Sequence, residues 1–332
     1  MKINIPKIRE LPILLILAGI AGIITVVNPS FITLENLMSL FKSNLTLSIM
    51  SLGMLMVLLT GGIDVSTGAL IAVTTYITAQ CLVRTSSNLF VVFFVSCFSG
   101  IVMGIINGWF ISRLKIPPII TTLGTMNIFQ GVLLYLTGGS WVTELPENFI
   151  MFGRITVFNI VLKNSRSVGF PVQGFIFIFA IILTWFLLKK TVIGRGVYAL
   201  GGNRESAERM GYKPNRILTF VYAYEGLLVG LAAVSHTSIM RQVDPNAFLG
   251  FEMQVIAALV LGGVSTAGGT GSILGTLLGV AVFCVINNGL ILMKIPTYWQ
   301  KILVGIIIIV SISVDMFQKQ RAERKQIRVD VE

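Results

Sequence analysis

The stretch LFVVFFVSCFSGIVMGIINGWFIS, residues 89–112, contains no charged side chain. A helix of about 20 apolar residues crosses the hydrocarbon core of a bilayer, which is about 30 Å thick. Apolar runs of about 17 residues or more recur along the whole chain, whereas an outer-membrane barrel would show alternating segments of about ten. The sequence therefore predicts an all-α polytopic membrane protein.

The composition supports the same class. Of the 332 residues, 55% are hydrophobic and 12% are charged, against about 25% charged residues in an ordinary soluble domain. The mean hydropathy is +0.87. The net charge of +11 is accounted for by basic residues in cytoplasmic loops, and no basic stripe is interleaved with exposed aromatic residues. We therefore expect a lipid bilayer as a partner and no nucleic acid.

We expect about ten membrane-spanning helices in a single transmembrane domain, residues 1–332. The first apolar run ends without a signal-peptide cleavage site, so we expect it to remain as the first span. Glycine pairs interrupt the pattern in the second and eighth spans. The expected spans are 11–27, 38–60, 66–83, 89–112, 117–137, 174–188, 217–238, 251–265, 271–292 and 300–317.

The distribution of basic residues predicts the orientation. With ten spans and the N-terminus inside, the segments 1–10, 113–115, 189–216 and 318–332 lie on one side of the membrane. They hold 17 of the 25 Lys and Arg residues. Because cytoplasmic loops carry the excess of Lys and Arg, we expect a bacterial inner-membrane protein with both termini in the cytoplasm.

The loop 189–216 holds seven of these basic residues and a sequence typical of a short helix. Asn203 is a good N-cap, Glu205 favours the first turn, and Gly211 favours the end. The predicted two-turn helix over 204–210 is too short to be stable without a docking surface. One alternative is a helix lying on the membrane surface, but RESAERM lacks the large apolar residues that such helices insert. A cytoplasmic protein partner is the favoured interpretation.

Two glycine-rich segments indicate an internal repeat. GIVMGIING at 100–108 and GSILGTLLG at 271–279 each place three glycines at four-residue spacing, and each run leads to a Lys-Ile-Pro sequence, at 115–117 and 294–296. Five spans separate the two copies, which would invert them in the membrane, as in many transporters. Glycine spacing alone also serves close helix packing in any membrane protein; the repeated exit favours the repeat.

The segment LLTGGIDVSTGAL, residues 58–70, places Asp64 directly after a glycine pair. An ionisable residue at membrane depth indicates function, and a broken helix frees backbone groups to line a polar cavity. Ser66 and Thr67 can cap the following helix. The alternative is a simple turn in headgroups or water, and the sequence leaves both open. Glu225 lies deeper in its span and needs a partner.

No motif for chemistry is present. The glycine-rich stretch LGGVSTAGGTGS at 261–272 lacks the Lys-Ser/Thr of a phosphate loop, and H-E-x-x-H and G-x-S-x-G are absent. His236 has no second His or Cys nearby, so a packed core or interfacial histidine is expected. We therefore expect no catalytic residue, metal or cofactor, with any ATP hydrolysis in a partner subunit.

Four stretches together resemble the permease subunits of carbohydrate-type ABC importers, the group for ribose, xylose, rhamnose and autoinducer-2. They are GGIDVSTGAL (61–70), LKIPPIITTLGTM (114–126), YALGGNRESAERMGY (198–212) and FEMQVIAALVLGGVSTAGGTGSILGT (251–276). GGSWVTELP (138–146) looks most like the rhamnose and autoinducer-2 branch. Glu225 departs from the small residue usual in the family.

The resemblance implies about ten helices and a dimer with a second permease copy or paralogue. It also implies cytoplasmic ABC ATPase subunits and a periplasmic or lipid-anchored solute-binding protein. The 198–212 stretch would carry the helix that couples to the ATPase. The coupling residues are Gly201, Gly202, Asn203, Glu205, Ala207, Arg209, Met210 and Gly211.

The leading hypothesis is thus a pore subunit without catalysis for a small sugar or sugar-like solute. The alternative is a proton-coupled secondary transporter using Asp64 or Glu225, while an intramembrane enzyme lacks a nucleophile–base pair. Polar or helix-breaking residues at membrane depth are expected to form the translocation pathway. They are Gly61, Gly62, Asp64, Ser66, Asn107, Asn127, Gln130, Asn287 and Asn288.

Overall fold

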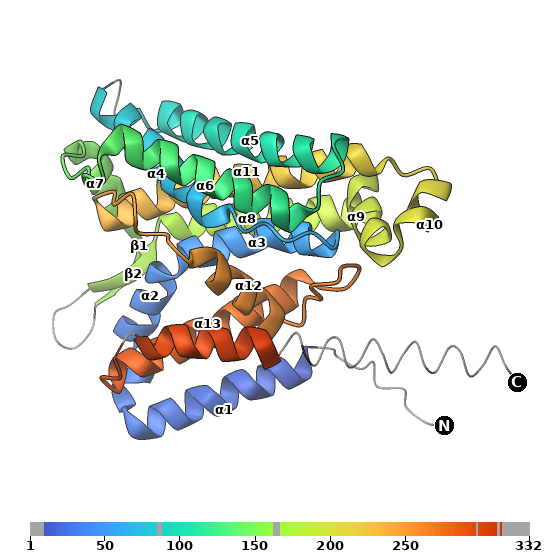
Figure 1. Cartoon of the computed structure of the whole chain (residues 1–332). Helices are drawn as coiled ribbons and strands as arrows, with labels where there is room; N and C mark the ends of the chain where they lie inside the picture. The colour runs from blue at the N-terminus through green and yellow to red at the C-terminus, as the bar shows by residue number, and fades with distance from the viewer. Residues whose placement is uncertain (1–9, 85–87, 162–166, 297, 311–312, 314–332) are drawn as a thin grey trace, which may run out of the picture.

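The computed structural model describes residues 10–84, 88–161, 167–296, 298–310 and 313, and it is almost entirely helical (Figure 1). The short elements near the N-terminus are η1 (Pro29–Ile32) and α2 (Leu34–Ser43). The remaining helices are α1 (Leu11–Val27), α3 (Leu45–Leu59), α4 (Thr67–Arg84), α5 (Leu89–Arg113), α6 (Pro118–Thr137), α7 (Glu147–Arg154), α8 (Gln173–Lys190), α9 (Val192–Gly202), α10 (Arg204–Arg209), α11 (Pro214–Met240), α12 (Phe251–Leu261), α13 (Ile273–Leu292) and the helix Tyr298–Val310.

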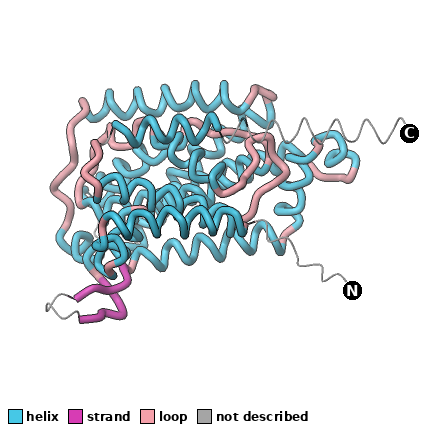
Figure 2. Tube along the Cα trace, turned by 90° about the horizontal axis from the view of Figure 1, so that it is seen from below, coloured by secondary structure: helices cyan, strands magenta, loops and turns pink. Residues whose placement is uncertain are grey.

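The axes of the long helices are roughly aligned with one another, and the helices form two groups (Figures 1 and 2). One group holds α4, α5, α6, α8 and α11, and the other holds α1, α12 and α13. Every residue of α3 is buried between them. Within an apolar stretch of 18 residues in each helix, 78% of the residues are buried in α11 and 28% in α5. α3 and α11 therefore form the core, while α5 keeps an apolar outer face that suits lipid.

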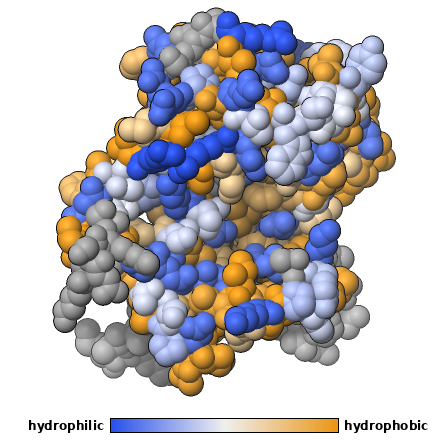
Figure 3. Space-filling view, turned by 90° about the vertical axis from the view of Figure 1, so that its left-hand side faces the viewer, coloured by the Kyte–Doolittle hydropathy of each residue, from blue (hydrophilic) through white to orange (hydrophobic). Residues whose placement is uncertain are grey.

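The end of the molecule that carries α7 mixes hydrophilic and hydrophobic residues, with hydrophobic residues along its sides (Figure 3). Phe90, Phe94 and Phe98 on α5 and Tyr135 and Leu136 on α6 are all more than half exposed. Such extended apolar exposure is unfavourable in water but is required of a helix in hydrocarbon. Among the described residues, five helices are long and apolar enough to cross a membrane: α5, α6, α8, α11 and α13.

Three expected spans differ from the structure. The span 38–60 is divided at Asn44 into α2 and α3, which meet at a 48° bend, and the Asn44 side chain donates a hydrogen bond to the Leu40 carbonyl at 2.8 Å. The expected span 251–265 contains the 11-residue α12, which ends at Leu261 with Gly262 as its C-cap. The helix of 300–317 is described from Tyr298 to Val310, and the remainder of this span lies outside the described residues.

The glycines of the two similar segments pack helices closely. A side chain at Gly100 or Gly104 of α5 would collide with backbone carbonyls of α11, at Gly226 and Tyr222. Gly275 and Gly279 of α13 approach α12 in the same way, at Gly262 and Ala258. The three glycines of the second segment do not share one helix, because Gly271 precedes α13 and has a φ of +158°, which residues with side chains rarely adopt.

The two ends of the molecule carry different elements (Figure 1). At one end lie α7 and a hairpin of β1 (Thr156–Val161) and β2 (Ser167–Pro171), which pair antiparallel with Val157 opposite Phe170. The other end carries α9 and α10. The start of α1 belongs to this second end, because Ser272 donates a hydrogen bond to the Glu10 carboxylate at 2.9 Å.

Candidate functional site

The expected short helix in the basic loop is present as α10. The Asn203 side chain accepts a hydrogen bond from the Ser206 N–H at 2.8 Å, as an N-cap does. Gly211 follows the helix with φ of +87°, the left-handed conformation that glycine adopts most readily. Sequence reasoning missed α9, which precedes it and whose N-cap, Thr191, accepts from the Gly194 N–H at 3.1 Å.

One side of α10 packs on the protein and the other side is exposed. Ala207 is completely buried, whereas Met210 is 65% exposed. The side chains of Glu205 and Arg209 are 86% and 84% exposed and form an i,i+4 pair with 4.0 Å between the charged atoms. The helix is therefore anchored through Ala207, and it exposes two opposite-charge pairs, Arg204 with Glu208 and Glu205 with Arg209, followed by the apolar Met210.

Five glycines from three separate segments meet at the start of α10. We call them the glycine junction: Gly61, Gly201, Gly202, Gly268 and Gly269. A Cβ atom at Gly268 would lie 2.7 Å from the Gly61 nitrogen and 3.0 Å from the Gly201 Cα. One at Gly269 would lie 3.0 Å from the Gly202 Cα. Only residues without side chains allow the three backbones to approach this closely.

Hydrogen bonds tie the glycine junction to its neighbours. The Gly269 N–H donates to the Leu59 carbonyl at 2.9 Å, and the Tyr198 hydroxyl of α9 donates to the Gly271 carbonyl at 3.1 Å. Partial burial raises the pKa of Tyr198 above its usual value, so the hydroxyl remains a donor at neutral pH. The stretch 261–272 is thus a structural connection between α3 and α9.

Directly after Gly61, a turn of the chain places Asp64 and Ser66 in a buried polar cluster. Gly61 has φ of +79° and ends α3, and Asp64 three residues later is completely buried. Asp64 Oδ1 accepts from the Ser66 N–H at 2.7 Å and from the Ser66 hydroxyl at 2.6 Å. Asn107 of α5 donates to Asp64 Oδ2 at 3.2 Å and to Ser66 Oγ at 2.7 Å. The alternative of a wet turn is therefore wrong.

Glu225 completes this cluster from α11. It is 1% exposed and accepts a hydrogen bond from the Thr67 hydroxyl at 2.9 Å, while its second oxygen, Oε2, has no hydrogen-bond partner among the described residues. The Thr67 hydroxyl also lies 3.0 Å from the Asp64 carbonyl oxygen. Thr67 is therefore the partner of Glu225, and it connects α11 to the turn that carries Asp64.

The depth of the cluster follows from helix geometry. Asn107 precedes Arg113, the last residue of α5, by six residues, which is about 9 Å along a helix at 1.5 Å per residue. The turn that carries Asp64, which we call the carboxylate turn, therefore lies beneath the end of the molecule that carries α10.

Sequence reasoning did not place Thr67 and Tyr222 as members of this cluster. The buried Tyr222 hydroxyl lies near Gly62, where a Cβ atom would approach it to 2.8 Å. Its spacing of three residues from Glu225 puts both on one helix face, which is the signal that was available.

The other expected pathway residues do not join the cluster. Asn127 donates to the Leu123 carbonyl of its own helix at 2.8 Å, and Gln130 donates to the Pro245 carbonyl at 3.1 Å. Asn288 of α13 pairs with Asn36 of α2 at 3.1 Å, and its neighbour Asn287 is half-buried. The structure therefore brings together Gly61, Gly62, Asp64, Ser66 and Asn107 and leaves these four apart.

The single histidine packs in the core. His236 Nδ1 lies 3.3 Å from the Thr46 hydroxyl, and its ring centroid is 4.7 Å from that of Phe248. Within the described part of the chain, no three His, Cys, Asp or Glu residues gather as metal ligands would.

A helical bundle with several long apolar helices and a buried polar cluster is typical of a polytopic membrane protein. Residues 36–312 match the family described as the permease component of branched-chain amino acid transport systems. The chain belongs to this family.

Individual relatives agree with the family. The ribose import permease protein RbsC of Bacillus subtilis is 37% identical over 88% of this chain and 88% of its own length. RbsC of Escherichia coli K12 is 34% identical over 91% and 92%. The autoinducer 2 import system permease protein LsrC of Photorhabdus luminescens is 31% identical over 92% and 89%. No solved structure gives a significant match.

These findings confirm the resemblance drawn from the sequence. The chain is a permease subunit of an ABC importer of the carbohydrate type, and the proton-coupled alternative is wrong. As a subunit of this kind, it carries several apolar helices through the membrane.

Proposed function

We propose that the chain forms the translocation pathway for a small sugar or sugar-like solute, delivered by an extracytoplasmic binding protein. The similarity to permeases named for ribose and for autoinducer 2 supports a solute of this size and polarity. The stretch GGSWVTELP at 138–146 favours a solute of the kind imported by the rhamnose and autoinducer-2 branch.

The observation that carries the mechanism is the connection from α10 to the carboxylate turn. The end carrying α10 and the start of α1 faces the cytoplasm, and both termini lie there. The exposed Glu205, Arg209 and Met210 dock into a cytoplasmic ATPase subunit. Movement of α10 is then transmitted through the glycine junction to Gly61 and the Asp64 turn, because close-packed backbones shift as a unit.

We also propose a dimer of permeases and ten spans related by an inverted repeat. Lys115 and Lys294, in the two Lys-Ile-Pro sequences, share the left-handed conformation with φ of 57° and 56°. This conformation is uncommon for residues other than glycine, so its recurrence in two similar sequences supports a common ancestry. A periplasmic or lipid-anchored binding protein and two ATPase subunits complete the assembly.

Coupling is tested by reversing charge on α10. Arg209→Glu, and separately Met210→Asp, should leave the permease folded because both side chains are exposed. Stimulation of the ATPase by loaded binding protein should fall in reconstituted complexes, together with uptake. Gly211→Pro should act similarly, since proline cannot adopt a φ of +87°.

Two controls separate docking from helix stability. The exchange Glu205→Arg with Arg209→Glu keeps an opposite-charge i,i+4 pair but reverses both outward charges, so it should also uncouple. Arg154→Glu changes an exposed arginine of α7 at the opposite end and should be silent. Wild-type ATPase stimulation in the α10 variants would refute the coupling role.

A further inference from the structure

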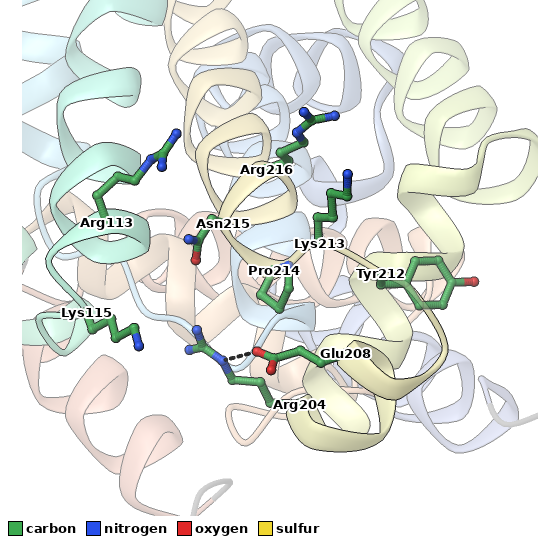
Figure 4. Close-up of a pocket in the computed structure, with 9 residues that line it drawn as sticks. All are labelled: Arg113, Lys115, Arg204, Glu208, Tyr212, Lys213, Pro214, Asn215 and Arg216. Atoms are coloured by element: carbon green, nitrogen blue, oxygen red, sulfur yellow. Dashed lines mark hydrogen bonds and ion pairs between the residues drawn. The ribbon is translucent and has the colours of Figure 1, made fainter.

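Beside α10, five basic side chains surround one cavity. It has a volume of about 520 Å³, far larger than the roughly 30 Å³ that one water occupies in the liquid. Figure 4 shows Arg113 and Lys115 on one side, Arg204, Lys213 and Arg216 across from them, and Asn215 between. We call this the basic cavity.

The basic cavity has a large excess of positive charge. Its one acidic lining residue, Glu208, pairs with Arg204 at 3.4 Å. Among the described residues, no carboxylate forms an ion pair with Arg113, Lys115, Lys213 or Arg216. Figure 4 shows the ends of Lys115 and Arg204 pointing toward each other, while those of Lys213 and Arg216 point away from them. Like charges that line one space repel one another. An anion with several acceptor oxygens, such as a phosphate, relieves that repulsion and satisfies the guanidinium donors.

A second, mostly apolar groove continues from the basic cavity along α5 and α11. It has a volume of about 380 Å³ and shares Arg113, Asn215 and Arg216 with the basic cavity. Its remaining lining residues are Ile105, Thr219, Phe220 and Ala223. Ile105 precedes Arg113 by eight residues on α5, so the groove descends about 12 Å from its basic mouth at 1.5 Å per residue.

We propose that the basic cavity and this groove together bind an anionic phospholipid, with the headgroup phosphate between Arg113 and Arg216 and an acyl chain in the groove. Basic pockets between membrane helices on the cytoplasmic side bind lipid headgroups of this kind. The cytoplasmic leaflet follows from the proposed orientation. The apolar groove distinguishes a lipid from an acidic protein segment or a free phosphate, because neither of these needs an apolar slot beneath the charged mouth.

The position of the lipid gives it a consequence. The basic cavity is lined by Arg204 and Glu208 of α10 and by residues 212–216, which join α10 to α11. A headgroup phosphate between Arg113 and Arg216 therefore joins the end of α5 to the first turn of α11, beside the α10 residues that line the same cavity. We expect it to hold α10 in its docking position.

The test uses the full-length permease purified in detergent, titrated with phosphatidylglycerol and, in parallel, phosphatidylcholine, with bound lipid counted by native mass spectrometry. Phosphatidylglycerol should bind more tightly. In Arg113→Gln/Arg216→Gln its affinity should fall about 25-fold, taking about fivefold for each cation near a lipid surface. Ala223→Phe, which fills the groove, should also weaken binding while leaving every cation in place.

The matched control is Arg84→Gln/Arg154→Gln, which removes two exposed arginines from the opposite end and should bind phosphatidylglycerol as the wild type does. Equal affinity in the Arg113/Arg216 variant would overturn the site. Inorganic phosphate that competes in both wild type and Ala223→Phe, with lipid binding unaffected by Ala223→Phe, would overturn the lipid in favour of a free anion. Loss of the lipid on adding the ATPase subunits would assign the cavity to an acidic segment of that partner.

The lipid proposal and the coupling proposal fail separately. The lipid titration requires no ATPase activity, and the coupling test changes Arg209 and Met210, which do not line the cavity.

Discussion

Asp64→Leu is expected to be among the most damaging single substitutions in this protein, because it removes the acceptor of a completely buried cluster. Three donors lose a partner: the Ser66 N–H, the Ser66 hydroxyl and one Asn107 N–H. The Ser66 hydroxyl can rotate to another acceptor, and the Asn107 amide keeps only the bond from its other N–H to Ser66 Oγ. Two donors, the Ser66 N–H and one Asn107 N–H, therefore remain without a partner, at a cost of about 1–3 kcal/mol each.

The resulting loss of about 2–6 kcal/mol has a measurable size. A destabilisation of 1 kcal/mol lowers the unfolding midpoint of a large domain by about 2 °C, so the apparent Tm should fall by about 4–12 °C. Asp64→Asn should be milder, because its oxygen still accepts from the Ser66 N–H and hydroxyl, and only the bond from Asn107 to Oδ2 is lost. Its membrane abundance should be nearly normal, with weakened uptake because the turn loses its charge.

The assay is thermal unfolding of the purified permease together with its abundance in membranes. Asp244→Leu is the matched control, since Asp244 also accepts from the N–H two residues later, at 2.8 Å, but in an exposed loop. Water replaces that acceptor, so the control should change little. A wild-type midpoint and abundance for Asp64→Leu would refute the reasoning.

Two further predictions concern the packing of α11. Gly108→Ala would place a Cβ atom 2.8 Å from the Thr219 Cα and should cost about 1–3 kcal/mol of stability through overpacking. The control Gly131→Ala, whose Cβ atom would have no atom within 4 Å, should be neutral or slightly stabilising, and equal unfolding midpoints for the two variants would contradict this packing. Glu225→Gln keeps the acceptor for Thr67 and should retain the wild-type midpoint within about 2 °C, while Glu225→Ala leaves a cavity and should lower it by about 4 °C or more. A large fall for Glu225→Gln would show that the charge, rather than the hydrogen bond, is required.

The local features of the sequence predicted α10 well because their interactions span few residues. The cap at Asn203 reaches three residues along the chain, and the stop at Gly211 depends on its own backbone conformation. The hydropathy of long runs likewise predicted α5, α6, α8, α11 and α13, since length and apolarity alone decide whether a helix can span a bilayer. The same rule failed at Asn44, because the mean hydropathy of 38–60 hides the polar residues Lys42, Ser43 and Asn44, where the helix bends.

The sequence by itself determined that this is a helical membrane protein of the importer permease family, and that a capped helix follows a glycine pair in its basic loop. Only the tertiary structure decided that Asp64 meets Asn107, 43 positions away in the sequence, and that Thr67 meets Glu225, 158 positions away. It also decided that three glycine segments join beneath α10. In a span that is apolar on every side, the hydropathy pattern does not mark which face packs inward. The partners of a buried carboxylate are therefore fixed by the packing of whole helices and by the need to satisfy a polar group where no water is available.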